Sequence, residues 1–269
     1  MQVRLAPRLY QAVMIKHFFR GRQLMFTLLV IIGALVMGRL GIWQLDRLAQ
    51  RQAINSAIQA RRAEPPVPLT PELAADTTQE YRRVEITGIF DTAQEVVLRN
   101  RTLDGATGVH VLTPLRFTSL AGTPLTVLVD RGWLPNTFAS ATARAPYAAP
   151  GGEVLIIGQI RRSQEDFGGP ADPPFTAERP RLDAWFRVDI PRITQQVGYP
   201  LLPIFVEQLP SANDAELPRP DPLTDLGQGP HLGYAIQWFA FAVILLVGYI
   251  AFIVQRQRRA DVHNRMQDN

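Results

Sequence analysis

Two groups of polar and aromatic residues, one near each end of the chain, carry side chains suited to ligand binding. The residues are Arg39, Trp43, Gln44, His231, Tyr234, Gln237 and Trp238. Steps of three and four residues place most members of each group on one face of a helix. Together they offer an imidazole, aromatic rings, amides and a guanidinium, which suit a flat, amphipathic ligand that carries carboxylates.

A haem fits this description, with His231 as an axial ligand to iron, Arg39 for the propionates and the aromatic rings against the macrocycle. Two simpler interpretations stay open. Trp and Tyr are also typical of an interfacial belt at the level of lipid headgroups. Gln and Arg are equally typical of side chains that only hydrogen-bond two membrane helices to each other.

Each group lies at the end of an apolar run long enough to cross a bilayer. The runs cover residues 24–45 and 231–254, and about 20 apolar residues are needed. Arg39 lies near the end of the first run, where a long side chain reaches the interface. The first run is too long for a signal peptide, and no small-x-small cleavage pattern follows it closely. The sequence therefore predicts two retained transmembrane helices.

Basic residues flank both runs on their outer sides. They are Arg4, Arg8, Lys16, Arg20 and Arg22 before the first run, and Arg256, Arg258, Arg259 and Arg265 after the second. Positive flanks tend to stay cytoplasmic, so 1–23 and 255–269 are predicted cytoplasmic tails around an extracytoplasmic domain, 46–230. We expect the inner (plasma) membrane of a bacterium, or the mitochondrial inner membrane of a eukaryote, with the lipid bilayer as a partner.

The domain between the runs is predicted to be rich in β-structure. Residues 46–63 have helical spacing and extend the first helix as far as Glu64-Pro65-Pro66, because proline ends a helix. Short alternating runs then predict strands at 81–90, 95–101, 108–117, 125–134, 154–161, 184–190 and 204–208. A helix is expected at 190–197, and loops at 166–180 and 210–230. This pattern predicts a membrane α+β protein with a small antiparallel β-barrel or sandwich-like domain.

Composition excludes several kinds of chemistry. The chain has no cysteine, so disulfides, thiolate nucleophiles and covalent haem attachment through C-x-x-C-H are excluded. Hydrolase elbows, glycine-rich phosphate loops and H-E-x-x-H are also missing, so we do not expect an enzyme. The segment 46–230 has 18 basic and 22 acidic residues, which argues against nucleic acid as a partner.

Two features of the central domain have both a structural and a functional interpretation. His110 lies in the apolar strand pattern VHVL, and we expect a strand residue with an ordinary hydrogen bond. The run DRGWLP (130–135) forms the end of the fourth strand pattern. It is interpreted as a local ion pair between Asp130 and Arg131 with a buried Trp133, or alternatively as an exposed edge that contacts a partner.

The sequence resembles the Surfeit locus protein 1 family. The matching segments are GIWQLDRLAQR (41–51), PVPL (66–69), YRRVEITGIFD (81–91), GVHVLTPLRF (108–117), VLVDRGWLP (127–135) and HLGYAIQWFAFA (231–242). They cover nearly the whole chain in the family's order. DRGWLP and HLGYAIQW carry most of the specificity.

The resemblance implies an assembly factor, with a chaperone-like role, for haem–copper cytochrome c oxidase. Bacterial members are associated with non-covalently bound haem a and its insertion into subunit I, and the family's candidate ligand corresponds to His231. The implied partner is subunit I or its assembly intermediate. Two alternatives are a scaffold that holds an oxidase intermediate without haem and, less favoured, an extracytoplasmic ligand-binding adaptor or sensor.

Overall fold

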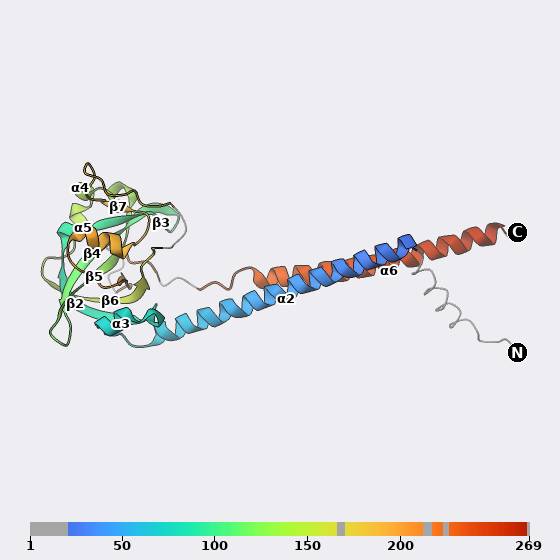
Figure 1. Cartoon of the computed structure of the whole chain (residues 1–269), viewed down its shortest axis with the longest axis horizontal. Coiled ribbons are helices and arrows are strands. Elements are labelled where there is room, and N and C mark those ends of the chain that lie inside the picture. Colours follow the sequence, from blue (N-terminus) through green and yellow to red (C-terminus); the bar gives the residue numbers. More distant parts are fainter. Residues whose placement is uncertain (1–20, 166–169, 212–216, 223–225, 268–269) are drawn as a thin grey trace. The chain divides into compact units, whose positions relative to one another are not determined.

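The computed structural model describes residues 21–165, 170–211, 217–222 and 226–267 and divides into two compact units (Figure 1). The helical unit comprises Met1–Asn55 and Gly227–Asn269, and the barrel unit comprises Ser56–Leu226. The predicted loops at 166–180 and 210–230 lie partly outside the described residues.

Two long helices dominate the helical unit: α2 (Gly21–Ala63) and α6 (His231–Gln267). Each contains a segment long and apolar enough to cross a membrane. Leu29, Leu35 and Ile244 leave 66%, 67% and 65% of their surfaces exposed, so the apolar surface is not covered by the protein. A continuous uncovered apolar surface of this kind suits a lipid environment. The helix α2 ends at Ala63, directly before the predicted proline stop.

Small and polar residues bring α2 and α6 together in antiparallel directions (Figure 1). A β-carbon on Gly41 would lie 2.7 Å from the ring of Phe239, so only glycine lets this ring approach. Thr27 and Tyr249 share a hydrogen bond of 2.5 Å between their hydroxyls. Close approach at glycine together with a polar contact between helices is the usual way that membrane helices associate.

The barrel unit is a small closed barrel of five strands. They are β2 (Arg83–Phe90), β4 (Ala106–Thr118), β5 (Pro124–Pro135), β6 (Glu153–Arg162) and β8 (Ile204–Gln208). The order around the barrel is β2-β6-β8-β5-β4, and pairing of Gly88–Phe90 with Leu115–Phe117 closes the ring. Three strands extend this sheet: β1 (Val67–Pro68), β3 (Val96–Leu103) and β7 (Ala184–Trp185).

The barrel is mixed, so the predicted antiparallel arrangement is wrong in part. The strand β8 runs parallel to β5, with Val129 opposite Val206, and antiparallel to β6. A ring of five strands cannot alternate direction all the way round, so at least one neighbouring pair must be parallel. The predicted strand at 184–190 is also shorter, because only Ala184–Trp185 pairs before the helix begins.

Short helices and turns cover the barrel. They are α3 (Pro71–Ala75), α4 (Ala141–Arg144), α5 (Ile190–Val197) and the 3₁₀ turns Thr77–Gln79, Thr92–Gln94, Asn136–Phe138 and Ala145–Tyr147. The helix α5 begins where the side chain of Asp189 accepts from the backbone N–H of Arg192, a normal N-cap.

The core has two main layers. Inside the barrel, inward residues such as Val84, Val129 and Val206 are completely buried. A second layer packs Leu98 and Leu112 against Trp185 of β7 and Ile193 of α5. The strand β4 is therefore buried on both faces, and residues 108–115 are all buried.

Candidate functional site

The first residue of α6, His231, meets α2 through its imidazole. Nδ1 lies 3.0 Å from Oε1 of Gln44, and both side chains are half-buried. The helix begins at His231 because Pro230, which has no N–H to donate, precedes it and accepts the first helical hydrogen bond from Tyr234. The antiparallel packing of the two helices thus brings two of the seven predicted site residues into direct contact.

The other ring nitrogen of His231 faces a glycine. A β-carbon on Gly229 would lie 3.3 Å from Nε2, so a larger residue at this position would crowd this edge of the ring. Gly229 also has a φ of 71°, a backbone conformation that residues other than glycine rarely adopt. Within the described ranges no hydrogen bond engages Nε2, which leaves it open to a ligand.

Trp43 is held by an arginine of its own helix. The guanidinium of Arg47, one turn further along, lies 5.5 Å from the centre of the Trp43 ring, close enough for a cation–π contact. We expected Arg39 to share this face, and Arg39 is exposed. Its side chain is available for an anionic group of a ligand.

The remaining predicted residues lie further along α6. Trp238 packs edge-to-face on Phe241, with ring centres 6.2 Å apart. Tyr234 and Gln237 are exposed. Among the described residues, no hydrogen bond or ring contact joins these three side chains to the pair formed by His231 and Gln44. They lie within about two turns of His231 on the same helix.

The donor set suits haem better than a metal ion bound by protein alone. The part of the chain that the structure describes contains no group of three or more His, Cys, Asp or Glu side chains that could hold a metal ion. A single imidazole is too little for such an ion, but one axial imidazole is sufficient for a haem, because the macrocycle provides the other nitrogens. The Nε2 of His231, which has no hydrogen-bond partner among the described residues, is the atom that fits this role.

A buried charged cluster in the barrel unit surrounds His110. Its Nδ1 lies 2.9 Å from Oδ2 of Asp130, and its Nε2 lies 3.3 Å from Oδ1 of Asp221. Burial alone would lower the pKa of His110, but the charge and hydrogen bond of Asp130, followed by those of Asp221, raise it to about 10. The expectation of a strand residue with a hydrogen bond is confirmed, and the two carboxylates favour the charged form of the imidazole.

The run DRGWLP is buried, and its ion pairs are not local. Arg131 pairs with Glu95 at 3.0 Å, and Arg144 pairs with the same carboxylate at 2.8 Å. Neighbouring strand residues point to opposite faces, so Asp130 and Arg131 cannot pair with each other. Trp133 is 8% exposed. Neither the local ion pair nor the exposed edge that the sequence suggested is present.

A segment that was predicted as loop completes this cluster. Arg219 pairs with Trp133 as a two-way backbone bridge. Glycine at position 132 permits this backbone bridge, because a β-carbon on Gly132 would lie 2.4 Å from the backbone of Arg219. Sequence analysis missed Asp221, since its proline-rich surroundings carry no strand pattern. The only available signal was a carboxylate between two prolines, which is too common to be specific.

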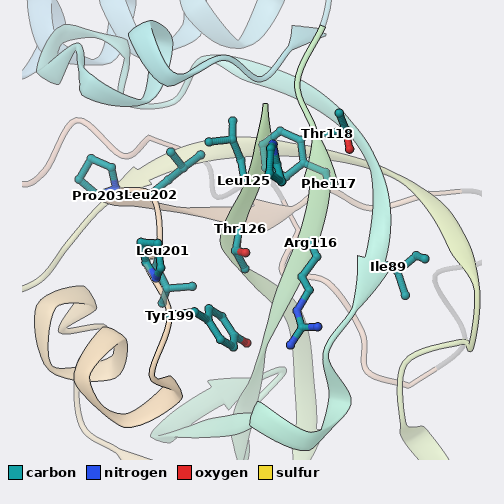
Figure 2. A pocket seen from close by; sticks show the side chains of 12 residues that line it. Ile89, Arg116, Phe117, Thr118, Leu125, Thr126, Tyr199, Leu201, Leu202 and Pro203 are labelled. Carbon is teal, nitrogen blue, oxygen red and sulfur yellow. The ribbon is translucent and has the colours of Figure 1, made fainter. Parts of the chain in front are cut away.

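A groove of about 590 Å³ lies on the barrel unit (Figure 2). Its lining is mostly apolar and includes Ile89, Leu125 and Leu201, with Arg116 and Tyr199 pointing toward one another at one side. The guanidinium of Arg116 lies 5.1 Å from the Tyr199 ring. Burial and a hydrogen bond to Asp91 raise the pKa of Tyr199 to about 12. The Tyr199 hydroxyl therefore stays protonated. The groove provides an apolar surface and one cation, Arg116, but no acid–base pair.

The fold and the site together define a class of protein in which a small barrel is flanked by two long apolar helices, with a histidine at the start of the second. The chain belongs to the SURF1 family, whose sequence model matches residues 31–243. It is 27% identical to a SURF1-like protein of Monosiga brevicollis, over 86% of this chain and 88% of that protein. Surfeit locus protein 1 of Arabidopsis thaliana is 26% identical (86% and 78%), and that of Mus musculus is 25% identical (78% and 70%). The family resemblance seen in the sequence is thereby confirmed.

Proposed function

We propose that this protein is an assembly factor for haem–copper cytochrome c oxidase that binds haem a at His231 and presents it for insertion into subunit I. The SURF1 family is known as a family of cytochrome oxidase assembly factors and not of known enzymes, and family membership supports the general role. We infer no catalytic residues.

The observation that carries the haem proposal is the state of the His231 ring. One nitrogen, Nδ1, is engaged by Gln44 at 3.0 Å. The other, Nε2, lies beside Gly229 and has no hydrogen-bond partner among the described residues. Haem-ligating histidines use one nitrogen for iron and the other for a fixed partner. His231 would hold the iron, while the exposed Arg39 would face the propionates and Trp43 and Trp238 would pack near the macrocycle.

We further propose that α2 and α6 anchor the protein in the bacterial inner membrane, or in the mitochondrial inner membrane of a eukaryote. Their apolar surfaces and the basic flanks support this location. The barrel unit would then face outward, on the side where His231 begins α6. Haem would be held close to the outer surface of the membrane.

An absorbance spectrum of the full-length protein, purified in detergent from cells that make haem a, tests the cofactor. We expect a Soret band in the wild type and its loss in His231→Ala. Gln228→Ala is the matched control, since Gln228 lies three residues before His231 and hydrogen-bonds Gln52 instead of the imidazole. An unchanged Soret band in folded His231→Ala would refute the ligand assignment.

A deletion strain tests the assembly role separately from haem. Loss of the protein should lower assembled cytochrome oxidase and leave the other respiratory complexes near normal. Restoration of oxidase by His231→Ala would favour a scaffold that works without haem. Normal oxidase content in the deletion strain would contradict the assembly function itself.

A further inference from the structure

We propose that Gln44 is a positioning residue that fixes the tautomer of His231, with the proton on Nδ1 and the lone pair on Nε2. The effect of Gln44 on iron binding rests on the proposed haem site. The tautomer of His231, in contrast, can be measured in the protein without haem. Gln44 would not touch the ligand. It would act through the imidazole.

The contact itself determines where the proton lies. A neutral imidazole carries one N–H, and an amide carbonyl oxygen only accepts hydrogen bonds. Because Oε1 of Gln44 lies 3.0 Å from Nδ1 of His231, Nδ1 must be the donor. The lone pair then belongs to Nε2, which is the nitrogen beside Gly229.

The opposite orientation of the amide would close the site. If the amide NH₂ of Gln44 faced the ring, Nδ1 would accept and Nε2 would carry the proton. A protonated Nε2 has no lone pair for iron. The orientation of the Gln44 amide therefore decides whether Nε2 of His231 can bind iron directly or must first lose its proton.

Contacts between the two helices hold Gln44 at this depth. Three residues before it, Gly41 packs on the ring of Phe239. Further along the pair, the hydroxyls of Thr27 and Tyr249 share a hydrogen bond. These contacts fix the register of α2 against α6, so the amide of Gln44 stays opposite the imidazole. The half-buried position also limits competition from water.

Such a partner affects both the affinity and the electronic properties of a bound haem. A hydrogen-bond acceptor on the remote nitrogen raises the basicity of the ligating nitrogen, and its loss typically lowers metal affinity about 10- to 100-fold. A carboxylate at position 44 would accept more strongly than the amide. Gln44→Glu should therefore increase donation to iron and make the haem reduction potential more negative.

The first experiment examines the protein without haem. Full-length protein in detergent micelles, labelled with ¹⁵N-histidine, is studied by NMR at about pH 8, where an ordinary histidine is neutral. His231→Ala assigns the His231 signals among the four histidines. We expect Nδ1 protonated and Nε2 unprotonated in the wild type. We expect a mixture of tautomers in Gln44→Met, which keeps the length of the side chain without the acceptor.

Gln52→Met is the matched control, because Gln52 makes a similar amide contact from the same helix without touching His231. It should keep the wild-type tautomer. A wild-type Nε2–H signal, or the same tautomer in Gln44→Met as in the wild type, would overturn the proposal whether or not haem binds.

The second experiment uses haemin as the probe. Gln44→Met should bind haemin roughly 10- to 100-fold more weakly than the wild type, and Gln44→Glu should shift the reduction potential to a more negative value. Gln52→Met should change neither quantity. If wild-type protein binds no haemin, the proposed haem site fails while the NMR result still decides the tautomer. If it binds and the Gln44 variants match the wild type, the positioning role fails alone.

Discussion

Replacement of His110 by asparagine should destabilise the barrel unit in a way that depends on pH. His110 is 6% exposed and lies between the carboxylates of Asp130 and Asp221. Asparagine is smaller than histidine and its amide can still donate hydrogen bonds, but it carries no charge. The substitution therefore leaves the buried carboxylate of Asp130 without its cation.

The magnitude follows from the pKa of His110. The ordinary value is 6.5 and the folded value is about 10. At about 1.4 kcal/mol for each pH unit, this interval corresponds to roughly 5 kcal/mol. Asp221 is 34% exposed, so solvent screens its share. We therefore expect a loss of about 3–4 kcal/mol at a pH near 6, in line with the usual cost of breaking a buried ion pair.

The sign of the pH dependence is fixed by the raised pKa. When folding raises the pKa of a cationic group, its charged form stabilises the fold. This stabilisation is complete at a pH below the pKa in the unfolded state, and it is lost as the pH rises through the pKa in the folded state. The difference in unfolding free energy between wild type and His110→Asn should thus be largest below a pH of about 6.5. It should shrink steadily as the pH approaches about 10.

Urea unfolding of the full-length protein in detergent measures this difference. Trp133 and Trp185 are both buried in the barrel unit and report its unfolding by fluorescence. Scans at several pH values, in wild type and variant, give the difference curve. A difference that stays constant between pH values of about 6 and 10 would show that folding does not raise the pKa of His110, and would refute the reasoning.

Two further predictions concern the helices. Gly41→Ala should weaken the pairing of α2 and α6, because its β-carbon would lie 2.7 Å from the Phe239 ring. Gly38→Ala is the control and should be neutral or slightly stabilising, because its β-carbon would have no atom within 4 Å. Resistance of the helices to unfolding by sodium dodecyl sulfate measures both effects. The proposed topology predicts that a membrane-impermeant thiol reagent labels Asn136→Cys but not Arg259→Cys in intact cells, since the natural chain has no cysteine. The reverse labelling would invert the orientation.

Local patterns in the sequence predict most strands and the helix α5 well. Alternation in YRRVEITGIF reflects the barrel interior directly, and β2 indeed runs from Arg83 to Phe90. The helix α5 covers the predicted residues 190–197. Strand direction was not predictable from these patterns, because β8 and β5 are separated by about 70 residues and alternation is the same in parallel and antiparallel pairs.

Contacts between distant residues were the hardest to predict. Helical spacing and opposed helices placed Gln44 and His231 at similar depth, and the structure joins them. Arg47 lies one helical turn from Trp43, and this local spacing agrees with the contact between its guanidinium and the Trp43 ring. By contrast, Glu95 reaches Arg131 and Arg144 across 36 and 49 residues of sequence. Only the folded sheet brings such charges together, so no local pattern signals them.

The position of β8 in the ring has a consequence for the order in which the chain can fold during synthesis. It fills the space between β5 and β6, yet it is the last strand to leave the ribosome. Until residues 204–208 emerge, β5 and β6 each expose an unpaired edge, which is a template for incorrect pairing with another chain. Closure of the barrel is therefore a late event, completed only about 20 residues before the second apolar helix begins. A pause in synthesis or a truncation before residue 204 would leave a nascent chain prone to aggregation.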